Sequence, residues 1–302
     1  MASSPSDPSR RYHDRVARRY DQIYQDPYWA FHDELTWRTI KPHIPRDLAS
    51  PCLDLGCGTG KWGLKLLKTG LSTTLVDHSP AMIDQTRLKL QPLGPKARRA
   101  TLLVADIIDL SALPPDHFAL ALAMGDPLSI CSDPPRAASE ILRTLRPGGI
   151  VMATADNKLA AIDHFLERAD LDGLEAFLRT SRTHWLTDNQ REQFNLTMFT
   201  PHTLRQLFEK AGFEVLSLVG KTILPIRKNP ALLDSPLALR RLLVLEQDLA
   251  KDPSAAARAS HLQITARKPL SPCSAVPIRP PPHRTFTRGP EKLASDKRRP
   301  DL

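Results

Sequence analysis

The chain has 302 residues, of which 41% are hydrophobic and 6% aromatic, so it can bury one sizeable core and is expected to form one domain with appendages. No apolar run approaches the ~20 residues needed to cross a bilayer, and the first residues lack the apolar stretch of a secretory signal. The four cysteines are scattered without a C-x-x-C pair, which predicts neither a zinc site nor a disulfide framework. We therefore expect a cytoplasmic protein without a resident metal.

The net charge of +9 is concentrated at the two ends of the chain. Residues 1–20 carry an excess of +3 and residues 267–302 an excess of +6, which leaves 21–266 neutral. The last 36 residues also contain eight prolines, a composition typical of disordered segments. We expect a disordered N-terminus over 1–11, a folded domain over 12–266 and a disordered Pro/Arg-rich tail over 267–302. A neutral domain argues against nucleic acid as the partner.

Taken in order, the chain alternates helix-like and strand-like segments. Helices are predicted over 12–24, where Tyr12, Val16 and Tyr20 share one face, and over 29–40. Strands are predicted over 52–55, 71–76, 100–105, 118–124 and 150–155, with helices between them. This order predicts a parallel sheet covered on both faces, in which ligands bind beyond the carboxyl ends of the strands.

The second half of the chain has a different pattern. Residues 157–196 are expected to be mostly helical, a helix is predicted from Thr200 to Ala211, and strands are predicted over 213–219 and 261–266. The segment between these strands, 221–257, is expected to be a second helical insertion. Because no crossover helix of normal length precedes the last strand, we expect the last two strands to pair antiparallel.

A glycine loop follows the strand at 52–55 and precedes a helix over 61–67. Gly56, Gly58 and Gly60 remove the Cβ atoms that would keep a ligand away from the backbone and permit positive φ values. The loop therefore predicts a ligand lying against bare main chain.

Three acids stand at the ends of three successive strands. Asp77 lies about 20 residues beyond the glycine loop, where a carboxylate can accept the hydrogen bonds of a ribose diol. Asp106 can accept from an adenine amine while Ile107 covers the ring, and Asp54 is placed to brace the loop. Each acid alone could simply cap a turn; the three together in register with the glycines indicate a nucleoside ligand.

Two nucleoside cofactors fit such a pattern. Residues 58–63 match G-x-G-x-x-G, which is typical of nicotinamide cofactors. However, the first glycine comes earlier, at Gly56, and the acid at position 106 has no special task in binding a dinucleotide. The pattern favours an adenosyl ligand without a pyrophosphate.

Taken together, these motifs resemble those of class I S-adenosylmethionine-dependent methyltransferases. The likeness is carried by LDLGCGTG at 53–60, LVD at 75–77, VADI at 104–107 and LRTLRPGG at 142–149, and it extends over about 12–266. The segments RRYD at 18–21 and LFEKAGFEV at 207–215 are similar to the branch that contains quinone-biosynthesis C-methyltransferases and other small-molecule enzymes. The resemblance implies an α/β, doubly wound, seven-stranded, mostly parallel sheet with an antiparallel last strand, and S-adenosylmethionine as cofactor.

The resemblance also implies site residues. The backbone around Gly56, Cys57 and Gly58 would approach the methionine moiety, Asp77 would hold the ribose, Asp106 with Ile107 would hold the adenine, Tyr20 would close over the methionine end, and Asp54 would support the loop. After the fourth strand the chain reads GDPLS at 125–129, without the second proline and aromatic of the D-P-P-aromatic motif of some amino-methylating relatives. This difference argues against methylation of a base or amide nitrogen by that mechanism.

The acceptor is less clearly indicated. A sulfonium makes its methyl group electrophilic, so the protein must mainly position the acceptor and, where needed, remove a proton. Asp126 is our first candidate for the base, ahead of His32, His164, His184 and His202. Phe165, Trp185 and Phe194 could line an acceptor pocket or form helix core.

We expect a small, partly apolar metabolite as acceptor. The alternatives are an RNA methyltransferase that uses its basic ends, and a non-catalytic domain that binds the cofactor and a protein partner.

Overall fold

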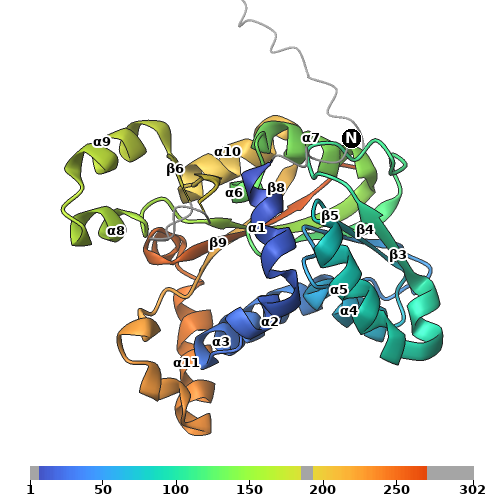
Figure 1. Cartoon of the computed structure of the whole chain (residues 1–302), viewed down its shortest axis with the longest axis horizontal. Helices are drawn as coiled ribbons and strands as arrows, with labels where there is room; N and C mark the ends of the chain where they lie inside the picture. The colour runs from blue at the N-terminus through green and yellow to red at the C-terminus, as the bar shows by residue number, and fades with distance from the viewer. Residues whose placement is uncertain (1–6, 185–192, 271–302) are drawn as a thin grey trace, which may run out of the picture. The chain divides into compact units, whose positions relative to one another are not determined.

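The computed structural model describes residues 7–184 and 193–270, which form an α/β domain around one seven-stranded sheet (Figure 1). The strand order is β3-β2-β1-β4-β5-β9-β8. Neighbouring strands are parallel from β3 through β5, whereas β9 is antiparallel to both β5 and β8. The doubly wound sheet and its antiparallel last strand, predicted from the sequence, are confirmed. The predicted tail beyond 270 and residues 1–6 lie outside the described residues.

The elements have the following bounds. The strands of the main sheet are β1 Cys52–Leu55, β2 Thr73–Asp77, β3 Ala100–Val104, β4 Phe118–Ala123, β5 Leu145–Asp156, β8 Glu214–Lys221 and β9 His261–Arg267. The helices are α1 Pro8–Val16, α2 Tyr20–Ile23, α3 Pro27–Ile40, α4 Lys61–Lys68, α5 Pro80–Leu90, α6 Pro127–Ile130, α7 Pro134–Thr144, α8 Ile162–Glu167, α9 Leu171–Thr180, α10 Pro201–Ala211 and α11 Pro236–Leu249. A separate two-stranded sheet pairs β6 Arg182–His184 with β7 Asn195–Thr197.

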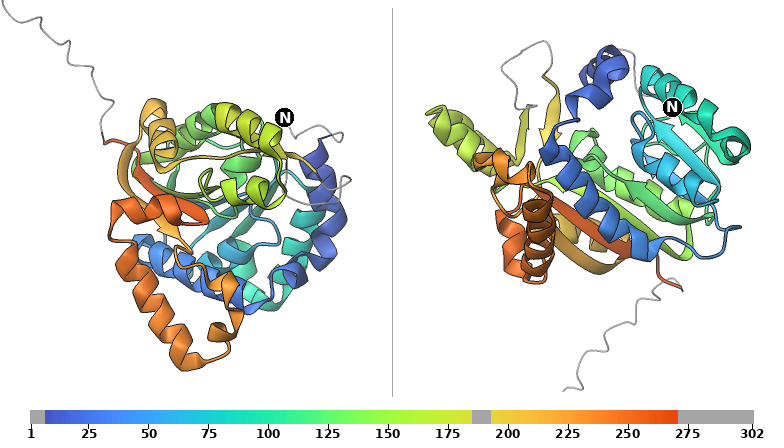
Figure 2. Two further views of the ribbon diagram at one scale, coloured as in Figure 1. Left: turned by 90° about the vertical axis from the view of Figure 1, so that its left-hand side faces the viewer. Right: turned by 90° about the horizontal axis from the view of Figure 1, so that it is seen from below.

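Helices cover both faces of the sheet because its central strands are apolar on both sides. In β4, Ala121 and Ala123 pack with the residues of α7 and α10, whereas Leu120 and Leu122 pack with those of α3 and α4. Figures 1 and 2 show α3, in blue, between α4 and α11. Among the residues that the structure describes, no helix is long and apolar enough to cross a membrane.

The N-terminal segment differs from the single helix predicted over 12–24. Helix α1 begins four residues earlier, at Pro8, so residues 8–11, which were expected to be disordered, are helical. The Asp7 side chain accepts a hydrogen bond from the Ser9 N–H at 2.9 Å and caps the helix. It ends at Val16, and a 3₁₀ turn over Ala17–Arg19 separates it from the short α2. The break redirects the chain so that α2 reaches the glycine loop.

The segment 157–196 is only partly helical. It contains α8 and α9, but β6 and β7 pair antiparallel with each other, so the predicted helical insertion includes two strands. Three-residue strands are stabilised by their partner rather than by local pattern, which is why sequence periodicity did not indicate them. The second insertion, 221–257, consists of α11 and short 3₁₀ turns, and its apolar side chains pack on Tyr28, Phe31 and Leu35 of α3.

The contact between α4 and the sheet leads to a stability prediction. A Cβ on Gly63 would lie 2.3 Å from Leu75 Cδ2 and 2.9 Å from Asp54 Oδ2. We expect Gly63→Ala to lower the free energy of unfolding by ~1–3 kcal/mol in urea titrations, because the helix must move away from β1 and β2. The control Lys68→Ala, at the exposed end of the same helix, should change it by less than about 0.5 kcal/mol. An unchanged stability in Gly63→Ala would contradict this account of the packing.

Candidate functional site

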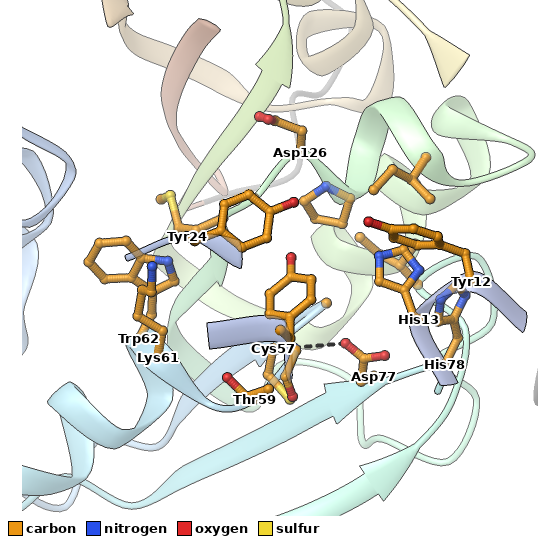
Figure 3. A pocket seen from close by; sticks show the side chains of 18 of the residues that line it. Tyr12, His13, Tyr24, Cys57, Thr59, Lys61, Trp62, Asp77, His78 and Asp126 are labelled. Carbon is orange, nitrogen blue, oxygen red and sulfur yellow. Dashed lines mark hydrogen bonds between the residues drawn. The ribbon is translucent and has the colours of Figure 1, made fainter. Parts of the chain in front are cut away.

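A cavity of about 580 Å³ lies at the carboxyl ends of the parallel strands, where the glycine loop, the strand-end acids and the N-terminal helices meet. Figure 3 shows Asp77 and His78 on one side of it, Lys61 and Trp62 on the other, and Asp126 across from Cys57. Of the residues predicted to form the site, the cavity is lined by Tyr20, Gly56, Cys57, Gly58, Asp77, Asp106, Ile107 and Asp126. Asp54 is the exception, since it does not line the cavity.

The glycine loop presents bare main chain to the cavity, as predicted. Gly56 has φ +63°, and a Cβ there would lie 2.9 Å from the Cβ of Pro127, which follows Asp126 in the loop after β4. Gly58 has φ +54° and lies under Tyr20, whose Cε1 would be 3.8 Å from an added Cβ. Glycine at position 56 is therefore needed both for the backbone conformation and for the close approach of the loop after β4.

The three strand-end acids have separate structural tasks. Asp77 accepts hydrogen bonds from Gly58 N at 2.8 Å and from Ser79 N at 2.9 Å, and so joins the loop after β1 to the loop after β2. Asp106 accepts from Ile108 N at 3.2 Å. Asp54 accepts from Gly63 N at 2.7 Å beneath the loop, and its burial raises its pKa to about 7. Asp54 thus braces the loop and helix α4, while Asp77 and Asp106 face the cavity.

The N-terminal helices are fastened over the cavity by charged and polar contacts. Asp21, beside Tyr20, accepts a hydrogen bond from Thr59 Oγ1 at 2.6 Å, and Lys89 donates to the same hydroxyl at 2.8 Å. Asp33 on α3 pairs with Lys61 at 2.7 Å. Because Tyr20 is held above Gly58, this closure places an aromatic ring over the glycine loop.

A cluster of charged side chains forms the opposite wall of the cavity. In the sheet register, Asp156 at the end of β5 lies next to His261 at the start of β9, and His261 lies next to Lys221 at the end of β8. His261 Nδ1 is 3.1 Å from Asp126 Oδ2 and 3.8 Å from Asp156 Oδ1. All four side chains line the cavity. The antiparallel direction of β9 brings its first residue to the edge where the parallel strands end.

Burial and charge set the protonation of this cluster. Burial alone would raise the pKa of Asp126, but the charge and hydrogen bond of His261 outweigh it and hold that pKa well below its usual range. Burial lowers the pKa of His261, and the charge and hydrogen bond of Asp126, with Asp156, outweigh burial and raise it. Burial, reinforced by the charge of Asp126, raises the pKa of Asp156 to about 7. Asp126 therefore favours the protonated form of His261, with which it forms a hydrogen-bonded ion pair below the raised pKa of the imidazole.

Asp126, Asp156 and His261 also offer three possible metal-ligand atoms within 4.8 Å of one another. The imidazole Nδ1 points at the two carboxylates, and the buried Lys221 ammonium adds a positive charge to the same wall. The arrangement is therefore a hydrogen-bonded ion pair rather than a cage of anionic ligands for a cation.

Asp126 has a further unusual feature, because its φ of +62° lies in the left-handed region. The N–H groups of Gly125 and Asp126 both donate to Thr154 Oγ1, at 3.0 and 3.1 Å. A strained residue held in this way is a common feature of functional sites. Its Oδ1 is buried and has no hydrogen-bond partner among the described residues.

The other candidates from the sequence separate into two groups. His32 and Phe194 line the cavity, whereas His164, His184, His202 and Phe165 do not. Phe165 packs instead with Phe177 and Phe194 in the apolar cluster behind the cavity. Trp185 lies outside the described residues.

Several cavity residues were not identified from the sequence. His261, Asp156 and Lys221 each stand at the end of a strand, and the predicted antiparallel direction of 261–266 was a signal that could have placed His261 at this edge. Tyr24 and Trp29 also line the cavity. They belong to the N-terminal segment, whose placement over the sheet depends on contacts between residues distant in the sequence.

The ion pair leads to a prediction about protonation. We expect Asp126→Asn to lower the pKa of the His261 imidazole, because the substitution removes the principal anion while Lys221 and the neutral His32 remain. The pKa is measured by NMR pH titration of the imidazole C–H signals, which are assigned with the variant His261→Gln. Asp248→Asn on the exposed surface of α11 should leave it unchanged. A pKa that stays the same or rises in Asp126→Asn would contradict the pairing.

The pKa shifts of Asp126 and His261 determine how this pair changes the stability of the fold with pH. Asp126, with a lowered pKa, contributes stability above its ordinary value of 3.8 and loses it as the pH falls. His261, with a raised pKa, contributes stability below 6.5 and loses it as the pH rises through the raised value. The pair therefore stabilises the fold most between about pH 4 and 6.5.

Comparison with known proteins agrees with this geometry. A family model described as a methyltransferase domain matches residues 52–149. Proteins named as uncharacterized methyltransferases from Mycobacterium tuberculosis and Mycobacterium bovis are 32% identical to this chain over 194 residues, 61% of this chain and 76% of theirs.

Solved structures share the fold at low identity. An S-adenosylmethionine-dependent methyltransferase from Methanosarcina mazei aligns with a TM-score of 0.56 at 20% identity, over 77% of this chain and 98% of that one. One from Mesorhizobium loti aligns with a TM-score of 0.53 at 19% identity, over 77% and 97%. The [4+2]-cyclase SpnF aligns with a TM-score of 0.51 at 21% identity, over 78% and 80%. From the family model and the mycobacterial relatives, together with the shared fold, we conclude that this chain belongs to the class I S-adenosylmethionine-dependent methyltransferases.

Proposed function

We propose that this methyltransferase acts on a small, partly apolar molecule bound in the same cavity as the cofactor. The observation that carries the proposal is that one cavity is lined both by the glycine loop with its acids and by several aromatic and apolar side chains, those of Tyr24, Trp29, Trp62, Met124 and Phe194. Mostly apolar pockets of this volume with a few polar groups are typical of small-molecule sites. The likeness of RRYD at 18–21 to the small-molecule branch of the family supports the same class.

The cofactor residues that we propose fit S-adenosylmethionine. Asp77 would accept from the ribose hydroxyls, since each of its oxygens accepts one backbone N–H and retains a second lone pair. Asp106 and Ile107 would hold the adenine, the backbone of Gly56–Gly58 would lie against the methionine moiety, and Tyr20 would cover it. Asp54 would act only through the loop that it braces, because it does not reach the cavity.

The bound cofactor would supply an electrophilic methyl group on a sulfonium, and the remaining tasks belong to the chain. The cavity walls orient the acceptor and exclude water, which supplies much of the catalytic effect in reactions of this kind. We assign the proton-accepting role to the neutral form of His261, which becomes populated as the pH rises through its raised pKa, and the orienting role to Asp126. Asp126 was our first candidate for the base, but a carboxylate with a strongly lowered pKa is a weak base, whereas imidazole near neutrality is effective.

The charge distribution and the closure of the site support a small acceptor over RNA. Residues 21–266 carry no net charge, and the basic excess lies in 1–20 and 267–302. The helices α2 and α3 are fastened over the cavity by Asp21 and Asp33. Since the same fold occurs in a cyclase, the fold alone does not select the reaction, and the proposal rests on the site.

The role of Asp77 can be tested by binding of S-adenosylhomocysteine in isothermal titration calorimetry. We expect Asp77→Asn to weaken binding at least tenfold, because hydrogen bonds to a charged acceptor are worth ~1.5–3 kcal/mol and because the new amide would face a backbone N–H of Gly58 or Ser79. Asp84→Asn, on the exposed face of α5, is the matched control and should bind normally. Equal affinity in Asp77→Asn and Asp84→Asn would remove Asp77 from the site.

The acceptor class can be tested with the intact protein, S-adenosylmethionine labelled in its methyl group, and separate metabolite and RNA pools from the native host. We expect label in the metabolite pool, with a rate that changes less than about threefold between low and moderate salt. Label confined to RNA, with activity that falls steeply with salt, would show that the basic ends deliver a polyanion and that the small-molecule proposal is wrong.

A further inference from the structure

One corner of the cavity, between α3 and β8, contains a buried cation without a counter-ion. The Lys221 side chain belongs to a residue that is 3% exposed, and its Nζ donates to Thr36 Oγ1 at 2.9 Å. Thr36 Oγ1 in turn donates to the carbonyl of His32 at 2.9 Å. An ammonium group has three N–H donors, and the described residues contain no carboxylate oxygen within 4.0 Å of this one.

The carboxylates whose charge acts on Lys221, those of Asp126 and Asp33, already have other partners. Asp33 pairs with Lys61 at 2.7 Å, and Asp126 pairs with His261 at 3.1 Å. Burial lowers the pKa of Lys221 to about 8, against the opposing effect of Asp126 and Asp33, so the ammonium form still predominates at neutral pH. The wall therefore carries one positive charge that no described residue neutralises at contact distance.

His32 adds an unmatched polar side chain at the same corner. Both of its ring nitrogens are buried without a hydrogen-bond partner among the described residues, and Nδ1 lies 3.7 Å from Asp33 Oδ1. Burial, with the charge of Lys221, lowers the pKa of His32 to about 3, so the ring is neutral and has one N–H. Buried ring nitrogens without partners cost free energy, and their presence at a cavity indicates that a ligand supplies a partner; the tautomer with its proton on Nε2 would donate to an anionic ligand.

The order of the strands places this corner away from the cofactor loop. Between β1, which leads into the glycine loop, and β8, which ends at Lys221, lie β4, β5 and β9. At 4.7–4.9 Å per strand pair the two strand ends are about 19 Å apart. Asp126 follows β4, the neighbour of β1, whereas His261 at the start of β9 is paired directly with Lys221 in the sheet register. A group held by Lys221 therefore lies beside His261, and an acceptor anchored there would have its reacting atom within reach of the imidazole.

Resting on the function proposed above, we propose that the acceptor is a carboxylic acid, whose carboxylate binds Lys221 Nζ and the His32 N–H and serves as a handle rather than as the methylated atom. One lysine and one neutral imidazole match a planar monoanion; a phosphate would be expected to take more positive charge or a helix N-terminus. The apolar body of the acid would lie against Tyr24 and Trp29. The methyl group would pass to a separate nucleophilic atom, whose proton His261 accepts, and the carboxylate would stay ionised.

The test divides the metabolite pool of the native host by anion exchange at pH 8 before incubation with the intact protein and methyl-labelled S-adenosylmethionine. We expect the label only in products of the anionic fraction, and we expect those products to remain anionic. Alkaline phosphatase treatment of the fraction should leave its acceptor activity unchanged. Label in the neutral fraction, a labelled product that has lost its negative charge, or acceptor activity removed by phosphatase would each overturn the carboxylate handle.

Variants test the role of Lys221 itself. With the anionic fraction as acceptor, Lys221→Met should lower kcat/KM at least tenfold, mainly through KM, while S-adenosylhomocysteine binds within about threefold of its normal affinity. Lys96→Met is the matched control, because the Lys96 Nζ is exposed and, among the described residues, bonds only to the Lys68 carbonyl. Equal kcat/KM in Lys221→Met and Lys96→Met would overturn the inference. Methyl transfer to a neutral metabolite would overturn it and leave the small-molecule function standing, whereas transfer to RNA alone would overturn both.

Discussion

The site depends on a single carboxylate that ties two loops together. Asp77 accepts from Gly58 N in the loop after β1 and from Ser79 N in the loop after β2. Ser79 then caps α5 by accepting from Met82 N at 3.1 Å, and its hydroxyl donates to Asp14 of α1 at 2.5 Å. The glycine loop, the start of α5 and the N-terminal segment are thus positioned by one connected set of hydrogen bonds. Substitution at Asp77 consequently affects the shape of the site as well as its contacts with ligand.

The second constraint is the direction of β9. In an all-parallel sheet only the last residues of strands reach the ligand edge, but an antiparallel strand contributes its first residue there. His261 therefore lies between Asp156 and Lys221 and within hydrogen-bond distance of Asp126. This insertion of β9 between β5 and β8 converts the edge of the sheet beyond the cofactor loop into a charged wall. The cavity accordingly has a glycine-rich end that carries the carboxylates of Asp77 and Asp106, where we propose that the cofactor binds, and a second wall formed by Asp126, Asp156, His261 and Lys221.

The fold was largely predictable because its signals are local. Strand β1 was predicted with its observed bounds, Ser79 caps α5 just before Pro80, and Gly212 ends α10 with φ +100° as expected for glycine after a helix. Two predictions about secondary structure were wrong because they depend on contacts between residues that a local sequence pattern does not indicate. The helix predicted over 12–24 breaks at 17–19, and β6 and β7 exist only because each is the other's partner.

The sequence by itself determined the residues that face the proposed cofactor site, because strand ends, glycines and acids follow each other at fixed spacing along the chain. Only the tertiary structure decided the acceptor side. His261, Lys221 and Asp156 come from three strands separated by insertions, and their proximity arises from strand order and register. It also decided the role of Asp126, which looked like a base by position. Its Oδ2 lies 3.1 Å from His261 Nδ1, and the charge and hydrogen bond of His261 hold its pKa well below the usual range, so we propose that it orients the imidazole instead.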